Sequence, residues 1–178
     1  GYFKMVPMIA TLGTMYIFRG FSFLFSGGEW WFPHQFTEGY MAFATKKILG
    51  IPSILWILII VFILAILFLG YTSKGRRIYA IGTNQESAQV AGIKQPRVVF
   101  LAMTLCGMLA GLSGMLYTAN YATCSYMIGD AYEMTAIAIC ILGGVSIVGG
   151  KGKVDGVIIG FLMMSVITYS VSYTHLTL

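Results

Sequence analysis

Charged side chains are scarce in this chain. Asp, Glu, Lys and Arg make up only 10% of its 178 residues, whereas hydrophobic residues make up 58%. Soluble domains carry about 25% charged residues, so this chain has too few to cover a soluble surface. Three stretches carry no charge at all, residues 48–73, 98–129 and 134–150. Because a helix needs roughly 20 apolar residues to cross a bilayer, the composition predicts an integral membrane protein.

The alternation of polar and apolar residues that marks the strands of a membrane barrel is missing as well. Residues 54–62 are continuously apolar, and a helix satisfies its own backbone hydrogen bonds inside a membrane. We therefore expect an all-α fold, a polytopic transmembrane helical bundle that forms one partial domain over residues 1–171. The expected membrane segments are residues 5–25, 54–71, 98–119, 132–148 and 157–171.

The two ends of the chain suggest a fragment. The chain begins with Gly1 rather than Met and has no basic stretch leading into a short apolar one, so we expect no signal peptide. Residues 172–178 follow an apolar segment without a charged anchor, and we expect them to be a non-native tail.

Motifs for catalysis and metal binding are lacking too. The three cysteines are an odd number and give no disulfide framework. His34 and His175 have no Cys, Asp or Glu at metal-ligand spacing, and no Ser-His-Asp or paired-carboxylate pattern is present. We expect no catalytic residue, no metal and no cofactor.

The sequence also lacks the motif of an ATP-binding loop. A Walker A motif needs Gly, four residues, and then Gly-Lys-Ser/Thr. Here Gly150-Lys151 is followed by Gly152, and Val145 stands at the position of the first glycine. We therefore do not expect the chain to hydrolyse ATP itself.

The basic residues indicate how the chain sits in its membrane. The formal net charge is +5, and we attribute it to membrane orientation rather than to nucleic-acid binding. The loop 74–97 holds five basic residues against the single acid Glu86, which predicts a cytoplasmic location. The loop 26–50 would then be outside, where Lys46 and Lys47 run against the charge rule.

A short helix is expected inside the loop 74–97. Thr83 and Glu86 have the spacing of a capping box, Asn84 is an alternative cap, and Gly92 is a natural stop. The expected helix covers residues 84–91. Two turns are marginal alone in water, so this helix must dock on a partner, on its own protein or at the lipid interface.

Some charges and glycines of the apolar segments need a separate explanation. Asp130 and Glu133 lie at the outer end of the fourth segment, where acids complement a helix dipole; alternatively they belong to an outer gate or a contact with a partner protein. Arg19 is a charge inside an apolar segment and is either functional or snorkels toward the interface. Small residues allow close helix packing, and they recur at Gly107, Gly111, Gly114, Gly156 and Gly160.

Three segments carry a family resemblance. Residues 75–93 contain Gly-Arg, Tyr-Ala-Ile-Gly, an Asn, an Ala and Gly-Ile in that order. Residues 129–152 contain Gly-Asp-Ala-Tyr-Glu-Met-Thr-Ala-Ile-Ala and then Leu-Gly-Gly-Val-Ser and Gly-Gly-Lys-Gly. Residues 7–14 read Pro-Met-Ile-Ala-Thr-Leu-Gly-Thr, with Arg19-Gly20 behind them. In these segments the chain resembles the permease subunits of ribose-, xylose- and galactoside-type bacterial ABC sugar importers.

The resemblance implies partners and a coupling mechanism. It implies a multi-pass protein of the bacterial inner membrane with a second permease subunit, identical or not, two cytoplasmic ABC ATPase subunits and an extracytoplasmic sugar-binding protein. The loop helix would be the coupling helix seated in the ATPase, and the substrate would be a sugar or sugar-like solute. The alternative partner contact of Asp130 and Glu133 would be with the sugar-binding protein. The residues expected to couple to the ATPase are Asn84, Glu86, Ser87, Ala88 and Gly92.

Two departures and two rival functions stay open. Thr135 stands where the family often has an acid, and Val145 where it often has Thr. A secondary transporter would place ionisable residues within the membrane, and the spans from residue 54 onward have almost none. A membrane scaffold without transport would not need the capped loop helix.

Overall fold

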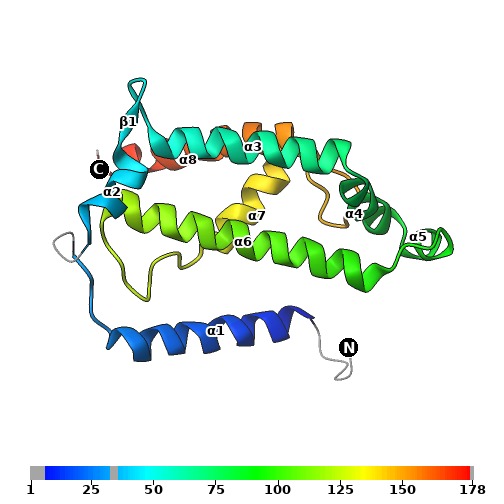
Figure 1. Cartoon of the computed structure of the whole chain (residues 1–178), viewed down its shortest axis with the longest axis horizontal. Coiled ribbons are helices and arrows are strands. Elements are labelled where there is room, and N and C mark those ends of the chain that lie inside the picture. Colours follow the sequence, from blue (N-terminus) through cyan, green and yellow to red (C-terminus); the bar gives the residue numbers. More distant parts are fainter. Residues whose placement is uncertain (1–6, 33–35, 177–178) are drawn as a thin grey trace.

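Long apolar helices dominate the computed structural model, which describes residues 7–32 and 36–176, with the side chains of residues 7, 8 and 174–176 left aside. Within these ranges, four helices are long and apolar enough to cross a membrane. They are α1 (Pro7–Ser26), α3 (Ser53–Tyr71), α6 (Gln95–Tyr121) and α8 (Val154–Leu176) (Figure 1). The all-α membrane fold is confirmed. His34 lies outside the described residues.

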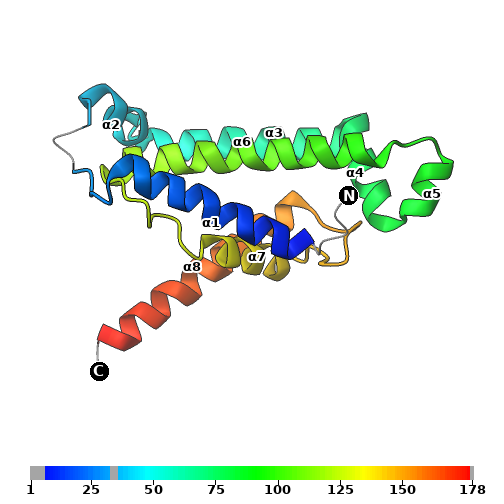
Figure 2. The ribbon, with the colours of Figure 1, turned by 90° about the horizontal axis from the view of Figure 1, so that it is seen from below.

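The α3 and α6 helices run side by side along the long axis of the molecule, whereas α8 diverges toward the C-terminus (Figure 2). A groove of about 450 Å³ separates α3 from α6 and is lined mainly by aliphatic side chains, with Ser113, Asn120 and two tyrosines at the α6 side. The α8 helix continues through residue 176 without a break at 171. It therefore includes residues 172–176 of the expected tail, whose non-native origin stays a prediction.

The fourth apolar segment forms a shorter helix than expected. Its helix α7 (Tyr132–Leu142) has 11 residues, about 16 Å at 1.5 Å per residue, against a hydrocarbon core of about 30 Å. It ends in a Schellman motif: Gly144 N–H donates to the Ile141 carbonyl and Val145 N–H donates to the Cys140 carbonyl, both at 2.9 Å. Gly144 has φ +77°, so the sequence stops this helix before it can span the membrane.

The α7 and α8 helices pack closely through glycines. A Cβ at Gly143 would lie 2.6 Å from the Gly156 carbonyl oxygen, and a Cβ at Gly160 would touch the Ile139 carbonyl and the Gly143 backbone. The packing role expected for Gly156 and Gly160 is confirmed. By contrast, nothing lies within 4 Å of a Cβ at Gly107, Gly111 or Gly114, so the described part of the chain does not use these glycines for packing.

The second half of the segment expected as a loop, residues 26–50, forms a helix and the first strand of a hairpin, which ends at residue 52. The helix α2 (Glu38–Thr45) packs on α6, and the Tyr40 hydroxyl contacts the Met115 carbonyl at 2.9 Å and Thr118 Oγ1 at 2.5 Å. The strands β1 (Lys47–Ile48) and β2 (Ile51–Pro52) follow. Leu49 and Gly50 between them have φ +54° and +82°, as in the two-residue turns that favour hairpins.

Little of the apolar surface is covered by the described chain itself. At most 6% of each candidate span is buried, whereas many large apolar side chains are exposed. The most buried apolar residues lie at the two ends of the molecule: Ala44 and Ala119 near α2, and Ile81 and Ala88 near the other end. Apolar surface on helices of this length suits a lipid environment.

Candidate functional site

The loop between α3 and α6 is almost entirely helical. It consists of α4 (Ser73–Thr83) and α5 (Gln85–Val90), and only the second was expected. Thr72 caps α4, because its Oγ1 accepts a hydrogen bond from Gly75 N–H at 3.0 Å. Gly75 is buried in the corner, where a Cβ would lie 2.6 Å from the Leu69 carbonyl oxygen. The Thr72 cap was the sequence signal that could have revealed α4.

A single residue separates the two loop helices. Asn84 is extended, with φ −156° and ψ 112°, and its Oδ1 accepts a hydrogen bond from Ser87 N–H at 3.0 Å. The capping box of Thr83 and Glu86 is wrong, because Thr83 is the last residue of α4 and its hydroxyl donates to the Tyr79 carbonyl at 2.9 Å. The alternative, Asn84 as the N-cap, is confirmed.

The end of α5 is fixed by a second Schellman motif. Gly92 N–H donates to the Gln89 carbonyl at 2.9 Å, and Ile93 N–H donates to the Ala88 carbonyl at 3.0 Å. Gly92 has φ +79°, a conformation that glycine adopts without steric cost. Gly92 as the stop of this helix is therefore confirmed, and the chain turns back sharply toward α6.

The five residues expected to couple to an ATPase fall into different environments. Asn84, Glu86, Ser87 and Gly92 are exposed. Ala88 is only 5% exposed, so its side chain packs inside the loop and has little surface left for a partner. The sequence reading missed Val90, an apolar side chain on α5 that is 90% exposed.

A second loop, residues 143–153, is clamped against α4. The Tyr79 hydroxyl donates to the Gly152 carbonyl at 3.0 Å, and a Cβ at Gly82 would lie 2.5 Å from Gly150 N. These contacts tie the loop helices to the segment between α7 and α8. The same loop exposes Ile147 (81%) and Val148 (93%), as α5 exposes Val90. Both segments lie at the same end of the ribbon (Figure 1).

An ion pair joins α1 to the start of α7. Arg19 Nη1 donates to Asp130 Oδ1 at 2.6 Å, and the two side chains are 23% and 65% exposed. Arg19 lies seven residues before Ser26, about 10 Å inside the end of the helix at 1.5 Å per residue. Glu133, in the first turn of α7, interacts electrostatically with the same guanidinium. The sequence pointed to Arg19 separately from the pair Asp130 and Glu133, and the structure brings Arg19 to these acids.

Aromatic and polar side chains gather near that ion pair. Trp31 and Cys124 pair their backbones, with Trp31 N–H donating to the Cys124 carbonyl at 2.9 Å. The Phe23 and Tyr126 rings meet edge to face with centroids 5.0 Å apart. A pocket of about 370 Å³ between these segments is lined by Ser22, Ser26, Glu29, Trp31, Phe36, Cys124, Ser125, Tyr126 and Ile128.

Metal ligands do not cluster in the part of the chain that the structure describes. Among residues 7–32 and 36–176, no group of three His, Cys, Asp or Glu side chains could hold a metal ion. Cys106, Cys124 and Cys140 are free thiols. The described chemistry is therefore that of helix packing, one ion pair and exposed loops.

These features define a polytopic helical membrane protein. Between its spans α3 and α6 it has two short helices, α4 and α5, which together form an elbow. Over residues 2–176 the chain matches the family described as "Branched-chain amino acid transport system / permease component", and it belongs to that family of permeases. The chain is thus part of a multi-pass membrane protein of this permease family.

Similar proteins are importer permeases. The chain is 37% identical over 161 residues to the ribose import permease protein RbsC of Bacillus subtilis (strain 168), covering 90% of this chain and 50% of the relative. It is 36% identical over 166 residues to RbsC of Escherichia coli (strain K12), covering 90% and 51%. It is 35% identical over 159 residues to the autoinducer 2 import system permease protein LsrC of Salmonella choleraesuis (strain SC-B67), covering 89% and 45%.

The chain spans about half the length of these curated relatives. No solved structure matches it.

Proposed function

We propose that this chain is part of the membrane-spanning subunit of an ATP-driven importer that moves a sugar or sugar-like solute across the bacterial inner membrane. The observation that carries the proposal is the α4–α5 elbow, capped at Asn84, stopped at Gly92 and fastened to a second loop by Tyr79. Because hydrogen bonds fix both ends of α5, this helix can act as a rigid element that transmits force. The similarity to ribose and autoinducer 2 import permeases supports the substrate class.

In this proposal α5 lies on the cytoplasmic side and docks on a separate ABC ATPase. Glu86, Ser87 and Val90 offer charge, a hydroxyl and an apolar side chain to the ATPase, and Ile147 and Val148 extend the apolar part of the surface. Ala88 acts indirectly, because its small side chain lets α5 pack on its neighbours. The ATP-hydrolysing motif belongs to the partner subunit.

The loop 143–153 connects the elbow mechanically to the helices α7 and α8. ATPase movement would shift α5, and α4 would carry the shift through Tyr79 and Gly82 to the loop between α7 and α8. The tight glycine contacts of α7 with α8 would make that pair move as one body. Rigid-body gating of this kind is the common mode of alternating access.

At the opposite end of this route, Asp130 and Glu133 are proposed to form part of an outer gate with Arg19. The α7 helix is too short to span the membrane, and short or broken helices are frequent at transport paths. The Arg19–Asp130 pair would hold α1 against the start of α7 in one state and release it in another. A second permease subunit and an extracytoplasmic sugar-binding protein would complete the importer.

The docking of α5 can be tested with a matched pair of charge reversals. Glu86 and Glu38 are both exposed acids in the first turn of a short helix, at opposite ends of the molecule. Glu86→Lys is expected to abolish co-purification of the ATPase subunit, while Glu38→Lys leaves it unchanged. Membrane insertion of both variants is checked by protease protection. Equal co-purification with both variants would refute docking through α5.

Two other functions remain as alternatives, a secondary transporter and a scaffold. Uptake driven by an ATPase should fall when ATP is depleted and persist when ion gradients are collapsed. The opposite pattern would favour the secondary transporter, and no solute uptake at all would favour the scaffold.

A further inference from the structure

Three cations line one pocket where α4, α5 and α6 meet. Arg77 comes from α4, Lys94 occupies the N-cap position of α6, and Arg97 lies in the first turn of α6. The pocket has a volume of about 300 Å³, and its other lining residues are Ala91, Gly92, Ile93 and Val98. A larger open pocket of about 670 Å³ shares Lys94 and Arg97 with it.

The chain itself provides no counter-charge in this pocket. Asp and Glu are absent from its lining, and the ion pair found among the described residues joins Arg19 to Asp130 at the far side of the molecule. Arg76, beside Arg77, is different, because its guanidinium donates to the Tyr71 carbonyl and to Ser73 Oγ. The pocket therefore presents concentrated positive charge to its surroundings.

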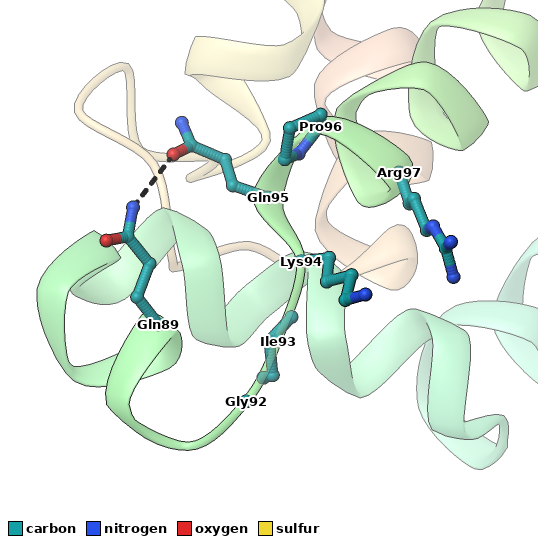
Figure 3. A pocket seen from close by; sticks show the side chains of 7 residues that line it. All are labelled: Gln89, Gly92, Ile93, Lys94, Gln95, Pro96 and Arg97. Atoms are coloured by element: carbon teal, nitrogen blue, oxygen red, sulfur yellow. Dashed lines mark hydrogen bonds between the residues drawn. The ribbon is translucent and has the colours of Figure 1, made fainter.

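Two of the three cationic side chains extend in a common direction. Figure 3 shows Lys94 and Arg97 projecting to the same side of the connecting segment, away from Gln89 and Gln95. The amide of Gln89 donates to Gln95 Oε1 at 3.3 Å, and this bond ties α5 to the start of α6. The positive end of the 27-residue α6 dipole adds to the field of the side chains.

The position of Arg97 in the sequence places the pocket at the membrane surface. Arg97 is followed at once by the charge-free residues 98–129, so it stands where α6 enters the hydrocarbon. Ile93 and Val98 give the pocket an apolar wall beside its cations. Adjacent charge and apolar surface match a phospholipid, whose phosphate lies next to its acyl chains.

We propose that Arg77, Lys94 and Arg97 bind the phosphate of an anionic phospholipid. The lipid would bridge α4 to α6 and so fix the elbow at the membrane surface. Arg binds phosphate with two parallel hydrogen bonds, and Lys adds a point charge. This site depends only on the membrane location of the chain, so it stands or falls separately from the proposed transport function.

The test compares variants of the full chain by native mass spectrometry in detergent. Phosphatidylglycerol is the anionic probe, phosphatidylcholine the zwitterionic one, and glycerol 1-phosphate the free phosphate. The site variant is Arg77→Gln/Lys94→Gln/Arg97→Gln. Its control, Lys46→Gln/Lys47→Gln/Lys151→Gln, removes the same charge from exposed lysines elsewhere. A charge-conserving variant, Arg77→Lys/Lys94→Arg/Arg97→Lys, checks that altered side chains alone do not abolish binding.

The proposal expects the site variant to lose phosphatidylglycerol binding by about tenfold or more, since each basic residue near an anionic surface contributes measurably. The control and charge-conserving variants should retain it, and free glycerol 1-phosphate should not bind. Equal losses in the site variant and its control would mean that only net charge matters. Binding of glycerol 1-phosphate would indicate a site for soluble phosphates. Retained lipid with lost ATPase co-purification would assign the cluster to the ATPase. Each of these three results overturns the proposal.

Discussion

The close contact between α7 and α8 allows a quantitative prediction for Gly143→Ala. Gly143 has φ −75° and ψ 3°, a backbone conformation that alanine adopts freely. The cost of the new methyl group therefore comes from packing alone. A Cβ at this position would lie 2.6 Å from the Gly156 carbonyl oxygen and 2.8 Å from Val157 Cα.

The neighbouring atoms leave little room for relaxation. Both belong to the backbone of α8, so no side chain can swing aside, and ordinary contact begins at 3.4 Å. The two helices must separate by most of an ångström to admit the methyl group. Overpacking of this kind costs about 1–3 kcal/mol, and the rigid neighbours put Gly143→Ala in the upper half of that range. The melting temperature should fall by roughly 5–10 °C, at about 2–4 °C per kcal/mol for a chain of this size.

The control is Gly107→Ala, because nothing lies within 4 Å of a Cβ there. Alanine in a helix interior is favoured over glycine by about 0.5–1 kcal/mol, so this variant should melt at an unchanged or higher temperature. The assay follows thermal unfolding in detergent through dye labelling of Cys140 on α7, with Cys106 and Cys124 replaced by alanine. If Gly143→Ala and Gly107→Ala have the same melting temperature, the glycine contact does not hold α7 to α8.

Three further predictions concern the elbow and the ion pair. Asn84→Ala should fray α5 by removing a cap worth about 1 kcal/mol, seen as faster amide exchange at Ser87, whereas Asn84→Asp should keep the protection. Gly92→Ala should destabilise the turn after α5 by about 1–2 kcal/mol, because its φ of +79° is left-handed; an unchanged melting temperature would contradict this. Arg19→Gln and Asp130→Asn should each lower the melting temperature, and the swap Arg19→Asp/Asp130→Arg should recover part of the loss. Purely additive effects would show that the two charges are not coupled.

Much of the candidate site could be predicted from local sequence. The helix α5 was expected because Asn84 and Gly92 act on their immediate neighbours, through a cap and a Schellman turn. The choice between Thr83 and Asn84 as the cap could not be made in this way. It depends on α4, whose last turn occupies the Thr83 hydroxyl and leaves Asn84 at the break.

The sequence by itself determined the membrane class, the positions of the long helices and the family motifs. Charge-free stretches of membrane length leave few alternatives, since a helix satisfies its backbone within one segment. Tertiary structure alone decided which elements contact one another. Arg19 pairs with Asp130, Tyr79 binds the elbow to Gly152, and Ala88 is buried. Such contacts join residues far apart in the chain, and no local periodicity or propensity records which distant backbone will lie beside them.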